Sequence, residues 1–396
     1  MTMAAAIESR TAEASARPMA GRIASVDIVG DLGKIEAIWR GFENEQQLFT
    51  PYQRFEFLST WQRRVGDHEG ASPFIVIAHD AERRPLLLLP LTLATRYGVR
   101  SASFMGGKHA TFNMALWDRD FASDATAADL AALISKLRER SQADLLALTQ
   151  QPERWRGVPN PFVMLPHQPS VNDCPVLHMV PGSAPELRIS HSFRRRLKAK
   201  EGKLQKLPGY RYRIAATEAD VRGLLDWFFR TKPLRMAERG LPNVFADGGV
   251  EAFIREACMM PLPGDDRVIT IHALECDEEI IALYAGVADG YRFSMMFNTY
   301  TTSAHSRHSP GLILLRYIVD HYAARGYRAV DLGIGSDGYK RMFCKSDEPL
   351  FDSFIPLSAR GSLAAAAMST LNRGKRRVKQ DRMLLQLAQA LRTAFR

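Results

Sequence analysis

Apolar and polar residues alternate along the first half of the chain in the patterns of a mixed α/β protein. Helical stretches show apolar residues at every third or fourth position, and strands show short apolar runs bounded by turn residues. Two such runs are separated by a charged turn, which predicts a β-hairpin. The predicted elements are, in order, strand 23–29, helices 31–39 and 51–65, hairpin strands 74–79 and 85–94, helix 129–140 and strand 145–148.

The second half repeats this order of elements. It contains two helices, a hairpin turned by acidic residues, a further strand, a long helix and a short strand: 217–230, 249–258, 268–274 with 279–287, 291–298, 310–325 and 329–332. Because the order recurs while residue identity is poor, we interpret the chain as a pseudo-duplication. The predicted fold class is α/β (α+β), with two tandem units that each have a mixed central sheet flanked by helices.

Proline-rich stretches and changes of composition suggest where the 396 residues divide. The first 22 residues are rich in Ala and Ser without a continuous apolar run, as expected of a flexible leader rather than a signal peptide. Near the other end, Leu384, Leu387, Leu391 and Phe395 recur every three or four residues, which predicts a C-terminal amphipathic helix. The predicted parts are leader 1–22, N-terminal unit 23–165, linker 166–190, C-terminal unit 191–357 and basic helical tail 358–396.

Charge is concentrated in two segments, although the whole chain carries a formal +10. Residues 188–206 and 372–396 each contain eight basic residues and one acidic residue, which leaves the rest of the chain mildly acidic. Nucleic acid is therefore an unlikely partner, because its binding spreads over many phosphates. The basic tail is expected either to dock on the protein itself or to lie on an anionic membrane as a peripheral contact.

The four cysteines stand far apart, without the spacing of metal ligands. This pattern is typical of reduced thiols in a cytoplasmic protein, and no metal site is expected. No apolar run reaches the roughly 20 residues needed to span a bilayer. We expect a cytoplasmic protein, with peripheral association at the inner membrane face as a secondary hypothesis.

The segment 305–344 carries the most chemical information. Ser309, Pro310 and Gly311 stand at the start of a predicted helix, with Ser309 as its N-cap and Pro310 at its first position. Backbone N–H groups and the helix dipole make such a start an anion site. Ordinary helix capping without a ligand is the alternative explanation.

Three short motifs in this region resemble a known family. Ser309-Pro310-Gly311, Asp331-Leu332-Gly333 and Tyr339-Lys340-Arg341-Met342-Phe343 resemble the C-terminal signature of the CelD/BcsL-like acetyltransferases of the GNAT superfamily, which are similar to FemAB-type tandem GNAT proteins. The likeness covers about residues 192–356. In the usual GNAT pyrophosphate loop, Ser306 and Ser309 here replace the consensus Arg/Gln and Gly, so that Gly311 is the one glycine retained.

The resemblance implies acetyl-CoA or another acyl-CoA as co-substrate, and it suggests roles for several residues. Asp331 could orient or deprotonate the nucleophile, Tyr339 could protonate the leaving sulfur, and Lys340 could hold a phosphate or acceptor anion. Ser309, Pro310, Gly311 and Arg194, which belongs to a basic helix over 192–206, are the candidate CoA-binding residues. Each also has a structural explanation: a strand-end hydrogen bond for Asp331, a half-buried ring for Tyr339, and solvated side chains for Lys340 and the basic helix.

Three functions remain open from the sequence. The first is an acyl-CoA-dependent N- or O-acyltransferase that acts on a glycan, polysaccharide or envelope precursor by direct transfer in a ternary complex. The second is an aminoacyl-tRNA-dependent transferase of the FemAB type, and the third is a non-catalytic GNAT-like scaffold. On the sequence alone, Lys340→Ala is expected to reduce turnover while leaving thermal stability nearly unchanged.

Overall fold

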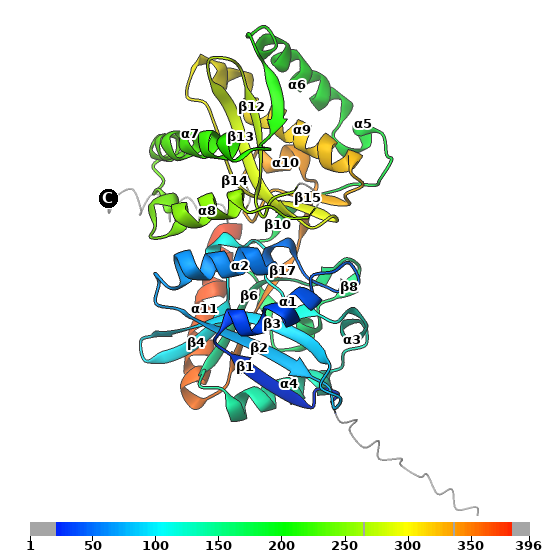
Figure 1. The fold of residues 1–396 in the computed structure, drawn as a ribbon, viewed down its shortest axis with the longest axis vertical. Helices are drawn as coiled ribbons and strands as arrows, with labels where there is room; N and C mark the ends of the chain where they lie inside the picture. The colour runs from blue at the N-terminus through cyan, green and yellow to red at the C-terminus, as the bar shows by residue number, and fades with distance from the viewer. Residues whose placement is uncertain (1–20, 264–265, 336, 382–396) are drawn as a thin grey trace, which may run out of the picture.

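The computed structural model describes residues 21–263, 266–335 and 337–381, and shows two α/β units, one above the other in Figure 1. Each unit is built on a mixed sheet flanked by helices, and a long helix follows the last strand. The predicted fold class is therefore confirmed. The proposed leader falls almost entirely outside the described residues.

The lower unit in Figure 1 contains an eight-stranded sheet in the order β1-β2-β3-β4-β6-β17-β9, with β5 paired to β3. The predicted hairpin is present as β2 and β3, and β4 and β6 pair in parallel. The strands are β1 (Ser25–Val29), β2 (Ser72–His79), β3 (Pro85–Arg96), β4 (Val99–Phe104), β5 (Leu116–Trp117), β6 (Leu145–Pro152), β9 (Gln168–Pro169) and β17 (Leu350–Pro356). The helices are α1 (Leu32–Gly41), α2 (Phe55–Trp61), α3 (Arg119–Ser123) and α4 (Ala127–Arg140), and a small separate ribbon is formed by β7 (Arg154–Trp155) and β8 (Val158–Pro159).

The single helix predicted over 51–65 is three short segments in the structure. A 3-10 turn, η1 (Pro51–Gln53), is followed by α2 and then by a π-helical turn, η2 (Gln62–Gly66). Arg54 separates the first two because its backbone is extended, with φ −61° and ψ 140°. The apolar spacing of the segment identified the buried face and did not register this interruption.

The upper unit has a seven-stranded sheet in the order β11-β12-β13-β14-β15-β10-β16. Its strands are β10 (Cys174–His178), β11 (Arg211–Ile214), β12 (Thr270–Glu275), β13 (Ile280–Ala288), β14 (Arg292–Tyr300), β15 (Ala329–Asp331) and β16 (Ser346–Glu348). Its helices are α5 (Pro185–Arg188), α6 (His191–Leu204), α7 (Glu218–Ala237), α8 (Val250–Met259), α9 (Pro310–Ala324) and α10 (Lys340–Phe343). Four further 3-10 turns are described: η3 (Gly107–His109) and η4 (Pro161–Met164) in the lower unit, and η5 (Val244–Ala246) and η6 (Ala304–His308) in the upper unit.

The two faces of the upper sheet are covered by different helices because apolar residues occupy both faces of its central strands. On β13, Leu283 and Ala285 belong to the core that includes α7 and α8, whereas Ala282 and Tyr284 belong to the core that includes α9. Successive side chains of a strand point to opposite faces, so this near-continuous apolar run is what a doubly covered sheet requires.

The chain crosses between the units more than once, and each crossing places a strand. β10 follows the strands of the lower unit in sequence, yet it pairs with β15 and β16 of the upper sheet. β17 follows β16, yet it pairs with β6 and β9 of the lower sheet. The segment 166–190 thus contributes to both sheets, and the segment 191–357 ends in a strand of the lower one.

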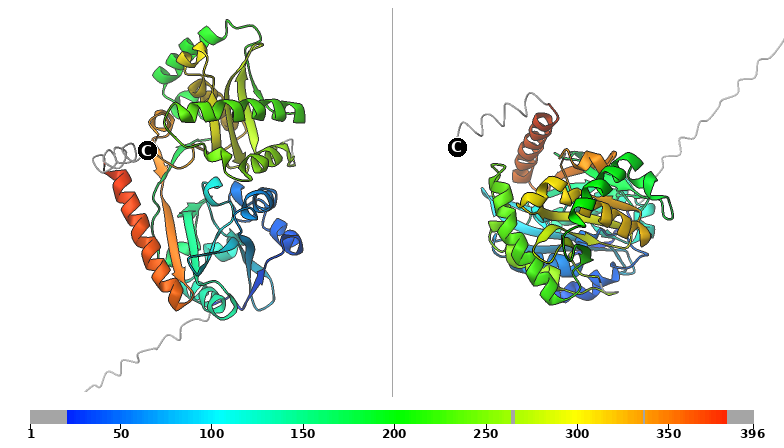
Figure 2. Two further views of the ribbon diagram at one scale, coloured as in Figure 1. Left: turned by 90° about the vertical axis from the view of Figure 1, so that its left-hand side faces the viewer. Right: turned by 90° about the horizontal axis from the view of Figure 1, so that it is seen from above.

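Helix α11 (Ala359–Gln380) packs along the lower sheet, on the side opposite α1 and α2 (Figure 2). Ala365 is buried against Leu145, Ala147 and Phe354. At its start, Gly361 approaches so closely that a Cβ atom there would lie 1.7 Å from the carbonyl oxygen of Asp144. This part of the basic tail therefore docks on the protein, whereas the predicted stripe of Leu384, Leu387, Leu391 and Phe395 lies outside the described residues.

The two units share one continuous apolar core. The rings of Phe57 and Phe253 meet edge to face with centroids 5.2 Å apart. Beside them, Glu256 of the upper unit accepts hydrogen bonds of 2.7 Å from both Arg63 and Arg64 of the lower unit. These contacts fix α8 against α2 and so define the space between the units.

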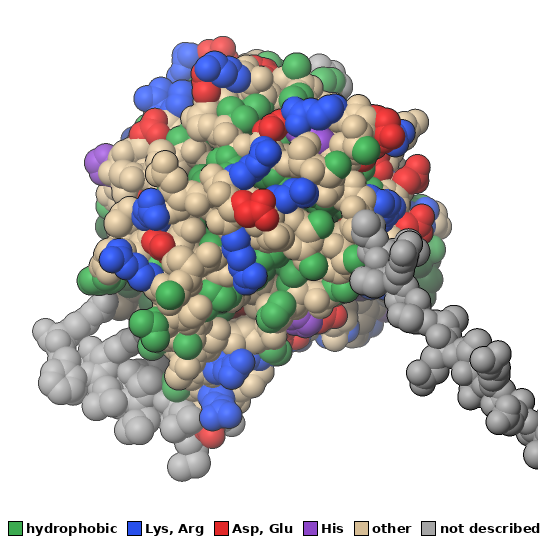
Figure 3. Space-filling view, turned by 90° about the horizontal axis from the view of Figure 1, so that it is seen from below, with side chains coloured by type: hydrophobic (Ala, Val, Ile, Leu, Met, Phe, Trp, Pro, Cys, Tyr) green, Lys and Arg blue, Asp and Glu red, His purple; other side chains and the backbone are tan. Residues whose placement is uncertain are grey.

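On the face of the lower unit that lies farthest from the upper one, acidic and basic side chains are interspersed among apolar ones (Figure 3). This mixture agrees with the mildly acidic balance of the chain outside its two basic segments. Within the described ranges, we find no helix with the length and apolar character that crossing a bilayer requires.

Candidate functional site

Two neighbouring strands of the upper sheet diverge, and this divergence opens the site. β14 and β15 pair in parallel only from Arg292–Ala329 to Ser294–Asp331. β15 ends there, whereas β14 continues to Tyr300. A β-bulge at Met296 interrupts the pairing of β14 with β13 just beyond the divergence, because Met295 faces Gly286 and Phe297 faces Ala285.

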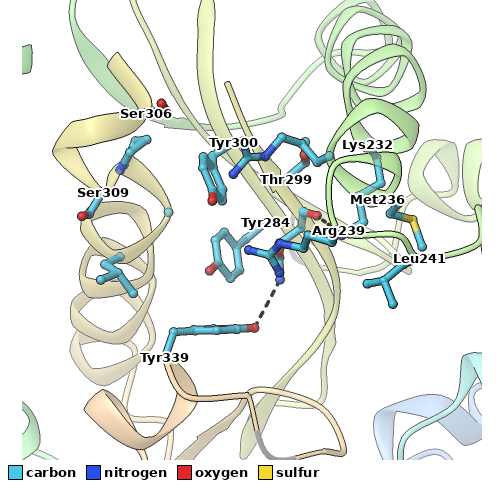
Figure 4. Close-up of a pocket in the computed structure, with 15 residues that line it drawn as sticks. Lys232, Met236, Arg239, Leu241, Tyr284, Thr299, Tyr300, Ser306, Ser309 and Tyr339 are labelled. Atoms are coloured by element: carbon cyan, nitrogen blue, oxygen red, sulfur yellow. Dashed lines mark hydrogen bonds between the residues drawn. The ribbon is translucent and has the colours of Figure 1, made fainter. Parts of the chain in front are cut away.

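A first cavity of about 320 Å³ lies on one side of the divergence (Figure 4). The last turns of α7, the end of β14 and the start of α9 form its walls. The residues that matter below are Lys232, Arg235, Arg239, Tyr284, Asn298, Tyr300, Ser309, Pro310, Gly311 and Tyr339. The structure thus brings Ser309, Pro310, Gly311 and Tyr339 together around one hollow, while their roles stay predictions.

At the start of α9, Pro310 occupies the predicted first helical position, but Ser309 does not cap the helix with its side chain as predicted. Pro310 is the first helical residue, and Ser309 occupies the N-cap position with a left-handed backbone, φ 56°. Its hydroxyl does not cap the helix. Instead it accepts a hydrogen bond of 2.7 Å from the Lys200 amine of α6, which brings a positive charge to the rim of the helix start.

Gly311 leaves room between α9 and the tyrosines of the sheet. A Cβ atom at this position would lie 3.6 Å from the Tyr284 hydroxyl and 3.7 Å from a ring carbon of Tyr300, which are ordinary contact distances. Arg235 lies over the opposite side of this hollow, with its guanidinium 4.0 Å from the centroid of the Tyr300 ring. The first cavity therefore combines aromatic walls, a helix N-terminus and basic side chains.

A second cavity, of about 440 Å³, lies between the two units. Lys108, His109 and Thr111 of the lower unit form one side of it, and α8, β14 and the loop after β15 form the rest. Four residues line both cavities, namely Lys232, Met236, Asn298 and Tyr339. Two hollows that share four residues can bring two ligands together at a common border.

Tyr339 and Lys232 are the ionisable residues at this border. Asn298 places its side-chain amide 3.5 Å from the Tyr339 hydroxyl, a weak hydrogen bond drawn in Figure 4. Burial raises the pKa of Tyr339, so the phenol keeps its proton at neutral pH. The Lys232 amine donates a hydrogen bond of 2.8 Å to the Asn298 carbonyl, and burial lowers its pKa to about 8.

The sequence analysis missed Lys232 because the predicted helix ended at residue 230. In the structure α7 runs to Ala237 and includes Pro233 in its interior. Proline inside a helix removes one backbone hydrogen bond, and a sequence pattern reads it as an end. The signal that was available is a lysine followed by proline at the end of an otherwise regular apolar stripe.

Lys340 faces the second cavity, and its amine is bound to the protein. It is 4% exposed, and it donates hydrogen bonds of 3.0 Å and 2.8 Å to the carbonyls of Gly333 and Ile334. Asp337 lies 3.8 Å away, and burial lowers the pKa of the lysine. Lys340 thus holds the loop between β15 and α10 in place, which differs from the solvated side chain considered from the sequence.

Asp331 and Arg194 line neither cavity. Asp331 is fully buried, accepts hydrogen bonds from Ser294 Oγ at 2.5 Å and from the Gly333 N–H at 3.0 Å, and has a pKa that burial raises to about 6. Arg194 is buried on α6, where its guanidinium binds Asp320 at 2.9 Å. The structure therefore separates these two residues from the cluster around Gly311 and Tyr339.

In the described part of the chain, no three His, Cys, Asp or Glu side chains are grouped as a metal site would require. The four cysteines are free and buried.

Comparison with known proteins identifies the fold of the upper unit. Residues 191–341 match a family model described as an acetyltransferase (GNAT) domain, and all seven residues singled out from the sequence lie within this range. No curated protein matches the chain in sequence. Residues 191–341 are thus similar in sequence to a GNAT acetyltransferase domain.

Solved structures of similar fold extend over both units. FemX has a TM-score of 0.52 at 6% identity, with 84% of this chain and 97% of that one covered. The C-terminal domain of a lysylphosphatidylglycerol synthetase from Agrobacterium fabrum has a TM-score of 0.51 at 11% identity, covering 87% and 96%. A conserved protein from Bacteroides thetaiotaomicron gives 0.51 at 11% identity, covering 83% and 99%. At these identities the likeness concerns the fold alone.

Proposed function

We propose that this protein is an acyl-CoA-dependent N- or O-acyltransferase that transfers the acyl group directly between two bound substrates. The observation that carries the proposal is the common border of the two cavities, where Lys232 and Tyr339 face both hollows. Direct transfer needs both substrates side by side, with groups between them that can move protons. Acetyl-CoA or another acyl-CoA is the donor that the CelD/BcsL-like resemblance implies.

The first cavity suits a CoA-type donor. Such a ligand is long and polyanionic, and the cavity combines the N-terminus of a 15-residue helix with Arg235 and Arg239 in its wall. Lys200 adds a further positive charge at Ser309. We assign Ser309, Pro310 and Gly311 to donor binding on this basis, and Arg194 to the support of α6 against α9 through Asp320.

Lys232 and Tyr339 suit the two proton transfers of the reaction. When an amine or hydroxyl attacks a thioester carbonyl, a new N–C or O–C bond forms and the C–S bond breaks. The nucleophile loses a proton and the departing sulfur gains one. We propose that the neutral Lys232 amine accepts the first proton, as its lowered pKa favours, and that the Tyr339 phenol, which is protonated at neutral pH, supplies the second.

Lys340 and Asp331 are proposed as positioning residues. Lys340 fixes the loop that follows β15, and Asp331 fixes the end of that strand through Ser294 and Gly333. Both therefore fix the backbone at the point where β14 and β15 diverge, without lining the border between the two cavities. For the acceptor, the resemblance suggests a polysaccharide or envelope precursor handled in the cytoplasm.

Ligand-dependent stabilisation tests the proposal. Acetyl-CoA, longer acyl-CoAs, free CoA and bulk tRNA are added in turn to the full chain, and the melting temperature is measured. A ligand present at about 100 times its dissociation constant stabilises the folded state by about 2.7 kcal/mol, which is readily seen. We expect a shift with acyl-CoA. A shift with tRNA alone would indicate the aminoacyl-tRNA-dependent alternative, and no shift with any of them would leave the scaffold.

A further inference from the structure

We propose that the second cavity binds the acceptor through an apolar body, either a hydrocarbon chain or an aromatic ring, which presents one amine or hydroxyl group to Lys232 and Tyr339. This inference rests on the proposed acyltransferase function and names the substrate class of the same site. It differs from the expectation of a free sugar acceptor.

The walls of the second cavity are predominantly apolar. Aromatic, aliphatic and thioether side chains from η5, α8 and β14 face it, among them Phe245, Phe253, Ile254, Met296 and Phe297. Methionine and aromatic side chains gain free energy by excluding water from an apolar ligand, and methionine adapts to ligands of irregular shape. Met296 stands at the β-bulge and lines the second cavity.

The polar side chains Thr111 and His109, on the lower-unit side of the cavity, each have one hydrogen-bonding position already occupied within the protein. Thr111 Oγ1 accepts a hydrogen bond of 3.1 Å from the buried Tyr52 hydroxyl. His109 Nδ1 accepts one of 3.1 Å from the Trp61 indole, and burial lowers the pKa of His109 to about 4, so that the imidazole is neutral. A sugar would bring several hydroxyl groups to this wall, each of which loses water and needs a new partner.

The charged groups are likewise compensated. Lys108 pairs with Asp247, and Lys340 binds two carbonyls with Asp337 nearby. Lys232 donates to the Asn298 carbonyl, and it lies at the border with the first cavity rather than in the apolar part. The second cavity therefore has one polar end, at the border where the reaction would take place, and apolar walls elsewhere.

The second cavity has its own entrance. Val244 and Asp337 both line this cavity. Val244 is 42% exposed, and the side chain of Asp337 is 65% exposed. A ligand can therefore enter here without passing through the first cavity. A separate entrance is what a second substrate needs, whereas the acyl chain of a donor would arrive through the border.

The experiment compares small primary amines of different polarity as acceptors. With acetyl-CoA as donor, octylamine, phenethylamine and glucosamine are supplied at equal concentration to the full chain, and the released thiol of CoA is measured. The four cysteines are buried, which keeps the background low. We expect at least one of the two apolar amines to be acetylated about tenfold faster than glucosamine. If glucosamine is acetylated as fast as both apolar amines, or faster, the inference is overturned. The proposed acyltransferase function would still stand.

A variant at the entrance separates acceptor from donor. Val244→Trp places a large side chain at the mouth, and Val180→Trp, at a 70% exposed position that lines neither cavity, is its matched control. We expect Val244→Trp to lower kcat/KM for the better apolar amine about tenfold or more, with the KM for acetyl-CoA unchanged. A changed KM for acetyl-CoA, with the acceptor unaffected, would instead assign the cavity to the acyl chain and overturn the inference.

A binding measurement keeps the inference apart from the proposed function. If acetyl-CoA neither stabilises the protein nor reacts, the proposed transferase fails. Calorimetric titration with octylamine then decides the fate of the cavity: binding to the wild type that is lost in Val244→Trp would retain an apolar ligand site, and absence of binding would remove it as well.

Discussion

Lys232 and Tyr339 both line the border between the two cavities, and burial shifts their pKa values in opposite directions. Burial lowers the pKa of the lysine to about 8 and raises that of the tyrosine. Near neutral pH, a fraction of the lysine is neutral and able to accept a proton, while the phenol retains the one it would give. Pairs of this kind are how a site supports acid and base chemistry at one pH.

Replacement of the lysine tests its role. In Lys232→Met we expect kcat/KM to fall by about 100-fold, the usual scale of a general base. The wild-type rate should rise with pH and level off above about 8, because only the neutral amine accepts a proton, and this limb should vanish in the variant. The pH profiles of the wild type and of the variant are measured with the same acceptor. Protonation of the acceptor then affects both profiles equally.

Thermal stability supplies the control for this variant. The folded protein holds the Lys232 amine at a lower pKa than an unfolded chain does, which opposes folding while the amine is charged, below about pH 8. Methionine removes that cost and also removes the donor to the Asn298 carbonyl, so the two effects oppose each other and Lys232→Met should melt close to the wild type at neutral pH. Lys198→Met, at an exposed position of α6, should leave both rate and melting unchanged. An unaltered pH profile in Lys232→Met would exclude the lysine as the base.

At this scale the sequence predicted part of the site. It singled out Ser309, Pro310, Gly311 and Tyr339, which all line the first cavity. These residues stand at the starts of α9 and α10, next to strands whose apolar runs are readily recognised in the sequence. It did not find Lys232, because an internal proline hides the last turns of α7. Neither could it show that Asp331 is enclosed, since its strand pairs with β10, which is distant in sequence.

Among elements, the loop between β15 and α10 is where a single side chain has the largest structural effect. Lys340 supplies hydrogen bonds to two carbonyls of this loop and is itself buried. The sequence-based expectation for Lys340→Ala, lost turnover without lost stability, therefore needs revision. Two carbonyls would lose their donor, and a buried acceptor without a partner costs about 1–3 kcal/mol.

We thus expect Lys340→Ala to lower the melting temperature by several degrees and to reduce turnover as the loop loosens. Differential scanning fluorimetry and steady-state rates on the same preparation measure the two effects. Lys345→Ala, an exposed neighbour that bonds only the Arg341 carbonyl among the described contacts, is the matched control and should show neither. A Lys340→Ala protein that melts like the wild type yet turns over slowly would restore the direct role considered from the sequence.

The elements themselves were predictable to different degrees. Helix α9 and strands β13 and β14 appear close to where apolar periodicity places them, because local pattern and tertiary burial agree there. Which sheet β10 and β17 join was beyond the pattern, since both read as short apolar runs and their partners lie far away along the chain.

At the scale of the whole molecule, the two units are joined by strands as well as by contact. β10 and β17 each belong to a sheet other than the one their neighbours in sequence suggest, and the apolar core runs from α2 across to α8. The order of elements in the sequence predicted two units. It left their mutual attachment open, because long-range pairing leaves no local trace.

We therefore expect the protein to unfold in a single calorimetric transition, since neither sheet can be dismantled without disturbing the other. Phe253→Ala, which removes a buried ring from the junction, should shift that transition downward as a whole, by about 3–5 kcal/mol of unfolding free energy. Leu133→Ala, a buried position of α4 remote from the junction, serves for comparison and should shift the same transition. Two transitions that respond separately to the two substitutions would contradict this coupling.

Lys108, His109 and Thr111 of the lower unit line the second cavity, whereas the helix start at Pro310 in the upper unit lines the first. Under the proposed function, variation in the short stretch from 107 to 111 would alter one wall of the acceptor cavity and leave the donor cavity unchanged. A library confined to those five positions would then explore new acceptors while the proposed donor site is kept.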